Sequence, residues 1–328
     1  MSPIPRNRRR EPRRRTAVVL VLLTTVLIAA CGSRKSSSSS ASSASSAAAT
    51  ASTSTSAASS GGTLTLGTKN FTEEYIVGQL YKQALTAAGC KINYKESIGA
   101  TEVVDKALTS GQIDAYPEYT GESVATVFGL NQAVSSPQDE YNLAKQAYAK
   151  RGQVMSNMTP FFDTDAIAVT KAYAQKYGLV NTADLKKIAH FTLGARPEFL
   201  NREEGAVGLK KVYGVDNFSF KSLALGLQYE ALDSGAVQAI DVFTTDPQLA
   251  SGKYVVLKDP KNIFGYQNIA RVVNKDKVNV CPTLMSTVNK VNALLTTPAI
   301  IAMNKAVAID HQQPATVAAS FLKANNLG

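Results

Sequence analysis

The chain has 328 residues, of which 45% are hydrophobic and 18% charged, so it can hold two modest domains and is not disordered throughout. Its formal charge of +10 does not indicate a nucleic-acid partner, because residues 1–30 contribute +6 and leave +4 for the rest. Lysine pairs such as Lys186-Lys187 are interpreted as solvated helix faces, since no basic stripe with interleaved aromatic residues accompanies them. We therefore exclude nucleic acid as a partner.

The N-terminal region predicts export. Seven arginines lie in the first fifteen residues, and the apolar stretch 17–30 that follows is too short to span a bilayer comfortably, so residues 1–30 are predicted to be a signal peptide. The stretch ends LIAACG, a pattern typical of a lipobox, in which Cys31 is acylated and becomes the first mature residue. The alternative is an ordinary signal peptide with an incidental cysteine. The arginine cluster leaves the secretion route, general or twin-arginine, open.

Residues 36–60 contain only serine, alanine and threonine, a composition that buries too little apolar surface to fold. Residues 31–61 are thus predicted to be a lipidated cysteine followed by a flexible tether, with a reach of roughly 30 Å as a random coil. We expect the protein to be anchored by lipid to the cell membrane, on its extracytoplasmic face.

The folded part begins with a strand, a polar loop and a helix. Residues 63–68 alternate polar and apolar side chains like a half-buried strand, so Lys69 lies where the strand ends. Asn70 and Glu73 are predicted to cap the helix that follows, which ends at Gly89. Ligands of open α/β sheets bind beyond the carboxyl ends of strands, so a lysine, a phenylalanine and free helix N–H groups are well placed there.

Strands and helices continue to alternate, which is typical of βαβ units. A strand begins at Cys90, a helix ends at Gly111, and the next strand leads into tyrosines. The segment ALTSG at 107–111, before Ile-Asp, has a partial echo in ALDSG at 231–235, again before a strand with Ile-Asp. The echo indicates either a duplicated lobe or only the glycine helix stops that recur in any α/β protein.

Four segments carry a resemblance to a known family: GTKNFTEEYIVGQLY, SGQIDAYPEYTG, RPEFLNREEG and IFGYQNIARVVNKD. In this order and spacing they resemble the osmoprotectant-binding proteins of ABC importers, which are receptors for glycine betaine, choline and carnitine. The resemblance runs from about Thr63 to the C-terminus. It implies an α/β, two-lobed periplasmic-binding-protein fold of type II, with the ligand cleft between the lobes.

The same resemblance implies the domain boundaries. Lobe 1 comprises residues 62–163 and 268–328, and lobe 2 comprises residues 164–267, with chain crossings near Asp163 and Tyr266. It also implies a monomer that captures a quaternary amine and passes it to an ABC permease, without a cofactor or metal.

A quaternary ammonium group has no N–H to donate, so aromatic faces must meet its charge, while a betaine carboxylate needs lysine or arginine. By resemblance, Lys69 contacts the carboxylate and Tyr119 the cation. Arg202 is the preferred carboxylate-binding arginine, with Arg196 as a second candidate. We expect cage rings from Phe243 and Tyr266 to converge with that of Tyr119. The full predicted ligand-binding set is Lys69, Asn70, Tyr119, Glu122, Asp163, Asp165, Arg202, Phe243 and Tyr266.

Two residues depart from the family pattern. Asp165 stands where an aromatic residue is usual, and Glu122 stands where threonine is usual. Acidic groups beside a cleft favour a cation or a hydroxyl over a carboxylate, which shifts the expectation toward choline-like ligands. Alternatively, these acids pair with Lys69 and Arg202 in the open form, which leaves betaine binding intact.

Cys90 and Cys281 are the remaining cysteines, and in an exported protein an even pair indicates a disulfide. The resemblance places both in lobe 1, so a bond is geometrically possible. The alternative is two buried thiols.

The chain lacks an enzyme signature. His190 and His311 are the only histidines, and neither stands in a catalytic or metal-binding pattern. A hydrolase using Glu118 and Glu122 is conceivable, but paired acids near a cleft suit cation binding equally well. We predict a binding protein rather than an enzyme. The sequence leaves two further functions open: a receptor for a different small cationic or polar solute, and a surface interaction protein without a transport role.

Overall fold

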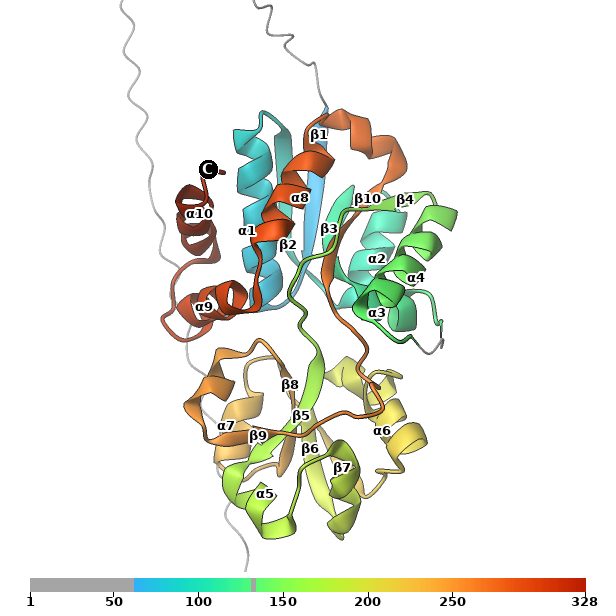
Figure 1. Cartoon of the computed structure of the whole chain (residues 1–328), viewed down its shortest axis with the longest axis vertical. Helices are drawn as coiled ribbons and strands as arrows, with labels where there is room; N and C mark the ends of the chain where they lie inside the picture. The colour runs from blue at the N-terminus through green and yellow to red at the C-terminus, as the bar shows by residue number, and fades with distance from the viewer. Residues whose placement is uncertain (1–61, 131–133) are drawn as a thin grey trace, which may run out of the picture. The chain divides into compact units, whose positions relative to one another are not determined.

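The computed structural model describes residues 62–130 and 134–328, so the predicted signal peptide, Cys31 and the tether lie outside the described residues. The chain divides into two units, and the second, residues 58–328, contains the fold described below. This unit is built from two five-stranded sheets with helices packed on both faces of each (Figure 1). It is the mixed α/β, two-lobed architecture that the sequence predicts.

The sheet of lobe 1 has the order β2-β1-β3-β10-β4. Its strands are β1 (Thr63–Lys69), β2 (Lys91–Gly99), β3 (Ala115–Tyr119), β4 (Gln153–Met155) and β10 (Ile269–Asn274). Strand β1 pairs in parallel with β2 and β3, whereas β10 pairs antiparallel with β3 and β4. The carboxyl ends of β1 and β3 therefore lie at the same edge of this sheet.

The sheet of lobe 2 repeats this plan, in the order β7-β6-β8-β5-β9. Its strands are β5 (Asp165–Thr170), β6 (Phe191–Ala195), β7 (Phe218–Ser222), β8 (Ala239–Phe243) and β9 (Tyr254–Val256). Strand β6 is parallel to β7 and β8, and β5 is antiparallel to β8. The segments ALTSG and ALDSG precede β3 and β8, which hold the same third position in the two sheets, as a duplicated lobe requires.

Helices cover both faces of the lobe 1 sheet. One face carries α1 (Thr72–Ala87), α8 (Leu284–Leu294), α9 (Thr297–Ala308) and α10 (Pro314–Ala324), whose apolar side chains form one core with β1. The other face carries α2 (Thr101–Thr109), α3 (Thr120–Glu122) and α4 (Pro137–Lys150). Lobe 2 contains α5 (Lys171–Tyr177), α6 (Ala206–Tyr213) and α7 (Gln228–Asp233).

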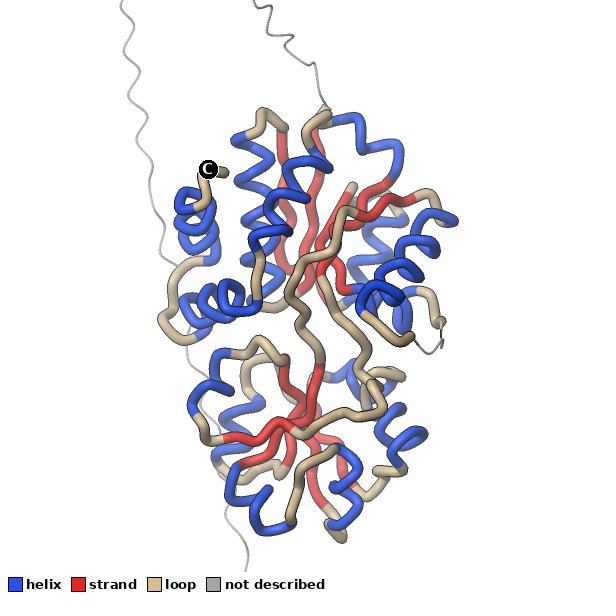
Figure 2. The backbone as a smooth tube through the Cα atoms, viewed as in Figure 1, coloured by secondary structure: helices blue, strands red, loops and turns tan. Residues whose placement is uncertain are grey.

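Two segments connect the lobes: residues 156–164 between β4 and β5, and residues 257–268 between β9 and β10. They run beside one another, and a β-bridge joins Phe162 to Asn268 (Figure 2). The crossings expected near Asp163 and Tyr266 lie within these segments. Paired connecting segments of this kind are where hinge motion between two lobes is absorbed.

The expected capping pair at the start of α1 is wrong. The N-cap of α1 is Phe71, and no side chain caps it. Glu73 is instead 3% exposed and accepts hydrogen bonds from Tyr119 Oη at 2.8 Å and from Thr245 Oγ1 at 2.6 Å. Glu73 does not serve as a cap because these tertiary partners hold its carboxylate in the interior.

The structure joins Cys90, after α1, to Cys281, before α8, in a disulfide with the Cα atoms 5.6 Å apart. This separation lies within the usual range for disulfides. The bond closes a loop across a sequence separation of 191 residues and ties the C-terminal helices to the first βα unit.

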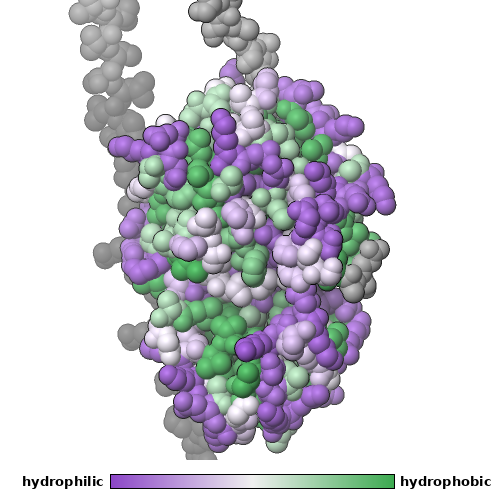
Figure 3. All heavy atoms as spheres, viewed as in Figure 1, coloured by the Kyte–Doolittle hydropathy of each residue, from purple (hydrophilic) through white to green (hydrophobic). Residues whose placement is uncertain are grey.

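Polar side chains cover much of the visible face, with apolar side chains gathered over part of lobe 2 (Figure 3). Among the described residues, no single helix is both long and apolar enough to cross a membrane; α8 and α9 reach the required length only as a pair bent by 90°.

Candidate ligand-binding site

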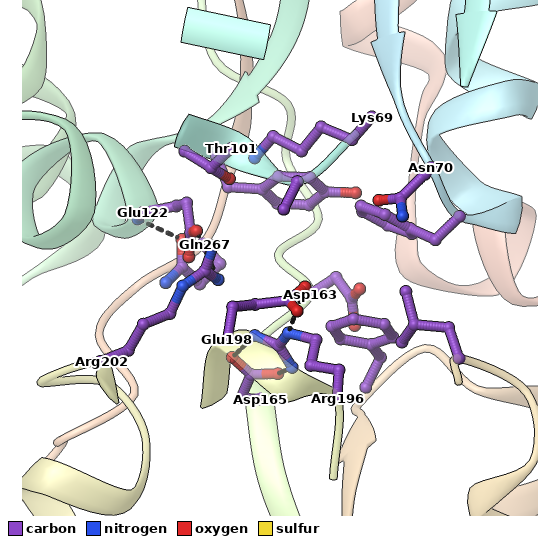
Figure 4. A pocket seen from close by; sticks show the side chains of 15 residues that line it. Lys69, Asn70, Thr101, Glu122, Asp163, Asp165, Arg196, Glu198, Arg202 and Gln267 are labelled. Atoms are coloured by element: carbon purple, nitrogen blue, oxygen red, sulfur yellow. Dashed lines mark hydrogen bonds and ion pairs between the residues drawn. The ribbon is translucent and has the colours of Figure 1, made fainter. Parts of the chain in front are cut away.

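The carboxyl ends of the parallel strands of the two lobes face each other across a cleft, as expected for ligand sites in α/β folds. Lobe 1 contributes the ends of β1 and β3 and the start of α2, while lobe 2 contributes the start of β5 and the ends of β6 and β8 (Figure 4). We call this cavity the first chamber. Its lining residues are Lys69, Asn70, Phe71, Ala100, Thr101, Tyr119, Glu122, Asp163, Asp165, Arg196, Glu198, Arg202, Leu225, Phe243 and Gln267.

Eight of the nine predicted ligand-binding residues lie in this lining, and Tyr266 does not. Arg196, the second candidate for a carboxylate-binding arginine, also lies there. Phe71, Thr101, Glu198 and Gln267 are lining residues outside the predicted ligand-binding set, although the sequence had placed the phenylalanine near the expected ligand position. Of these, Phe71 carried a usable signal, because it follows Lys69 and Asn70 directly at the end of a strand.

Three aromatic rings meet at the first chamber. The ring of Phe71 stacks on Phe243 of lobe 2, with centroids 5.2 Å apart and planes inclined by 25°. Its centroid is also 6.0 Å from that of Tyr119. Phe71 and Tyr119 belong to lobe 1 and Phe243 to lobe 2, so both lobes supply aromatic faces to one place.

Tyr266 is not the third ring, which corrects the predicted cage. Its hydroxyl donates to Ser135 O at 3.4 Å and its N–H donates to Glu140 at 3.1 Å, both away from the first chamber. Successive side chains of an extended segment point to opposite sides. Because Gln267 faces the chamber, Tyr266 faces the start of α4 instead, and the third ring in the lining is that of Phe71.

Gln267 holds the loop that carries Glu122. Its Oε1 accepts a hydrogen bond from the backbone N–H of Glu122 at 2.8 Å. Gly121 permits this approach, since a Cβ atom at that position would lie 2.8 Å from the Gln267 amide nitrogen.

Lys69 is buried, with 3% of its surface exposed, and its ammonium forms an ion pair with Glu118. Burial by itself would lower the pKa of Lys69, but the carboxylates of Glu118 and Glu122 outweigh burial and raise that pKa above its usual value. Lys69 is therefore a cation in the cleft wall. Its Nζ also lies 4.9 Å from the centroid of the Tyr119 ring, within the range of a cation–π contact.

Arg202 joins the lobes through ion pairs with lobe 1. Its Nη1 lies 2.6 Å from Glu122 Oε1, and its Nη2 lies 3.0 Å from Glu102 Oε2. Burial would raise the pKa of Glu122, but Arg202 and Lys69 lower it to about 2, so Glu122 is ionised at neutral pH.

Arg196 is the second buried arginine, and it pairs within lobe 2. Its guanidinium contacts Asp165 through two nitrogens, at 2.6 and 2.7 Å, and also pairs with Asp241. Its Cζ atom lies 5.3 Å from the centroid of Phe243. The two departures from the family pattern, Glu122 and Asp165, are thus both paired with arginine. Glu122 pairs with Arg202, one of the two bases named in the second interpretation of these acids, whereas Asp165 pairs with Arg196 and not with Lys69 or Arg202.

The first chamber has a volume of about 50 Å³ in this structure. An apolar cavity that admits benzene measures about 150 Å³. A trimethylammonium group therefore enters only if the lobes, or the Phe71 and Phe243 rings, move apart. This arrangement suits a receptor whose lobes open and close around a small solute.

Two α/β lobes, joined by two connecting segments and facing each other with the carboxyl ends of their strands, define a periplasmic binding protein. The family model for the substrate-binding domain of ABC-type glycine betaine transport systems matches residues 62–324. The chain belongs to this family, which consists of transport substrate-binding proteins and not of enzymes.

Named relatives agree with this placement. The ergothioneine transport permease/ergothioneine binding protein EgtU of Helicobacter pylori is 29% identical over 263 residues, which cover 79% of this chain and 47% of that protein. The chain thus spans about half the length of this relative. The glycine-betaine-binding protein of Pseudomonas aeruginosa is 28% identical over 277 residues, covering 81% of this chain and 88% of that protein.

The fold is also similar to that of solved structures. A crystal structure titled glycine betaine/carnitine/choline ABC transporter aligns with a TM-score of 0.65 at 25% identity, covering 80% of this chain and 99% of the other.

Proposed function

We propose that this protein is an extracytoplasmic receptor that captures a quaternary ammonium solute, of the glycine betaine, choline or carnitine type, and delivers it to an ABC permease. The observation that carries this proposal is the meeting of Phe71, Tyr119 and Phe243 at one chamber between the lobes. A cation without N–H groups is stabilised by about 0.5–2 kcal/mol for each aromatic face that it contacts.

The charges around the rings support a solute with a positive head. Three bases line the first chamber, Lys69, Arg196 and Arg202, and each forms an ion pair with a carboxylate of the protein. A ligand carboxylate would have to share these bases with the carboxylates that already hold them. A ligand cation meets ring faces and carboxylates without displacing any pair, so choline-like ligands are favoured over betaines. This differs from the expectation that pairing of the acids leaves betaine binding intact, because the pairs are formed inside the closed chamber that the ligand must enter.

The conformational consequence supports delivery to a transporter. The Phe71–Phe243 stack and the Arg202–Glu122 ion pair both cross between lobes. A solute that enters the first chamber must separate the rings and then be enclosed by both lobes, so binding changes the arrangement that a permease would recognise.

We also propose that the mature protein is a monomer attached to the membrane through a lipid on Cys31. Labelled palmitate should be incorporated into the full chain, and Cys31→Ser should abolish both the label and membrane retention. Equal labelling of the two proteins would rule out this anchor.

A thermal-shift screen of the mature protein with choline, glycine betaine, carnitine and a set of amino acids tests the proposed function. Ligand binding to the folded state raises Tm in proportion to the logarithm of ligand concentration above Kd. We expect concentration-dependent stabilisation by at least one quaternary amine. Flat curves for all of them would contradict the proposal and favour a surface interaction protein.

A further inference from the structure

A second chamber of about 250 Å³ lies beyond the Phe71–Phe243 stack. The two chambers share Asn70, Phe71, Asp163, Leu225 and Phe243, which therefore form the boundary between them. The remaining walls come from the first turn of α1, the loop before α7, the segment after β8 and the end of α9. The cleft thus continues from the quaternary-amine site into a larger space.

The charges in the second chamber differ from those in the first. The described residues that line it include three acids, Glu73, Asp163 and Asp246, and no lysine, arginine or histidine. In the first chamber every base is matched by an acid, whereas here the acids have no matching base. Buried carboxylates without a cation are costly, so such a chamber favours a positive guest.

Asp163 provides a free acceptor at the boundary. Its side chain is 4% exposed, and Oδ1 accepts hydrogen bonds from Thr244 Oγ1 at 3.2 Å and from the Thr245 N–H at 2.9 Å. Within residues 62–130 and 134–328, no protein group donates to its Oδ2 atom. A deeply buried carboxylate that lines both chambers therefore keeps one oxygen available for a ligand.

Asp246 repeats this arrangement inside the chamber. Its Oδ2 accepts hydrogen bonds from Tyr229 Oη at 2.8 Å and from the Phe243 N–H at 3.1 Å, and no described residue donates to its Oδ1. Burial raises the pKa of Asp246 to about 6. Burial and the neighbouring acids Glu73 and Asp246 also raise the pKa of Asp163. These shifts are those of acids that lack a counter-ion.

Glu73 differs, because the protein already satisfies it. Tyr119 donates to Oε1, while Thr245 and Asn304 donate to Oε2. Its role is to hold the Tyr119 ring and the Thr245 loop in place, and the two aspartates are left to meet a ligand.

We propose that the second chamber binds a hydrogen-bond-donating cationic end, such as an ammonium group, of a ligand whose quaternary head occupies the first chamber. This inference rests on the proposed function. The preferred ligand is then a dication with a short spacer, because Phe71 and Phe243 separate the two chambers by a single pair of rings. Asp163 at the boundary and Asp246 in the lining of the second chamber accept its N–H groups.

Two matched probes test this on the unmodified mature protein by calorimetry. In (3-aminopropyl)trimethylammonium a terminal ammonium replaces the terminal methyl of n-butyltrimethylammonium, so the two differ in charge and donors but hardly in shape. We expect the amino compound to bind at least tenfold more tightly. Equal affinities, or tighter binding of the butyl compound, would overturn the second chamber as a cation site.

Substitution of Asp246 tests whether the preference for the amino compound arises in the second chamber. Asp246→Asn should reduce the preference for the amino compound to about threefold or less, whereas Asp216→Asn, which removes the same charge from an exposed position of lobe 2, should leave it intact. An equal loss in both variants would show a general charge effect and overturn the assignment to this chamber. If Asp246→Asn does not fold, the two-probe comparison on the unmodified protein still decides.

The affinities of these compounds also distinguish failure of the second chamber as a cation site from failure of the proposed function. Binding of the butyl compound and of choline without a preference for the amino compound would leave the quaternary-amine site standing and remove the second chamber. Failure of all three compounds to bind would remove both.

Discussion

Phe71 of lobe 1 stacks on Phe243 of lobe 2 with ring centroids 5.2 Å apart. The contact joins the loop after β1 to the end of β8, and it lies between the two chambers of the cleft. The rings that we assign to a ligand cation are thus in contact with each other in this structure. Ligand binding must exchange this ring–ring contact for ring–cation contacts.

The first prediction concerns these rings. Replacing Phe243 by leucine keeps an apolar side chain but removes the aromatic face, so choline affinity measured by calorimetry should fall by about 2- to 30-fold. Phe71→Leu should have an effect in the same range. Tyr266→Leu is the matched control and should leave the affinity unchanged, since Tyr266 faces α4. A loss in the Tyr266 variant as large as that in the Phe243 variant would restore Tyr266 as a cage ring.

The second prediction concerns selectivity. Glu122→Gln should release Arg202 for a ligand carboxylate and strengthen glycine betaine binding relative to choline by about tenfold, or about 1.4 kcal/mol. Arg202→Gln should shift the ratio of the two dissociation constants the other way, because Glu122 and Glu102 then lack their partner.

The exposed pair Lys211–Glu203, with 65% and 41% of the side chains exposed, provides the control for this selectivity test. Neutralising either member should not change the ratio, since exposed pairs contribute little and lie in solvent. Shifts of the same sign in the Glu122 and Arg202 variants would refute this account of selectivity.

The third prediction is a pH dependence. The pKa of Glu122 in the folded protein is about 2, below its ordinary value of 4.5, so its ion pair stabilises the folded state above about pH 4.5 and is lost as pH falls toward 2. The difference in the free energy of unfolding between the unmodified protein and Glu122→Gln should be constant from pH 7 to about 5 and shrink below that. Denaturant titrations at pH 7, 4.5 and 3 measure it, and a difference that grows as pH falls has the wrong sign.

The fourth prediction concerns the disulfide. Replacing Cys90 and Cys281 together by serine should lower the free energy of unfolding by about 2–5 kcal/mol, because the bond closes a long loop in the unfolded chain. Urea unfolding under non-reducing conditions gives the value, and the unmodified protein should yield no alkylatable thiol until it is reduced. Two reactive thiols in the oxidised protein would mean that the bond is absent.

Local patterns predicted that the first strand ends at Lys69 and that strands and helices alternate along the chain. Both features depend on neighbouring residues: polar and apolar side chains alternate along a strand, and a glycine marks the end of a helix. The quoted motifs contain Tyr119 and Tyr266, while the family resemblance supplied Phe243, which lies outside those motifs. The motifs did not distinguish Tyr266 from Gln267, since a shift of one residue in an extended segment reverses which side chain faces the cleft.

Pairings between distant residues set the rest of the site. Glu73 fits a local capping pattern, yet Thr245, 172 residues away, and Asn304, 231 residues away, determine its place. Arg202 meets Glu102 across 100 residues and from the other lobe. Such contacts arise from the packing of two lobes, which no local spacing in the sequence encodes.

The central claim is that a permanently charged nitrogen is recognised by aromatic faces. Calorimetry with choline and with 3,3-dimethylbutan-1-ol, its uncharged carbon isostere, tests it most directly. Both compounds have the same shape and the same hydroxyl, so only the charge differs. Choline should bind at least tenfold more tightly, and equal or tighter binding of the neutral compound would contradict the account.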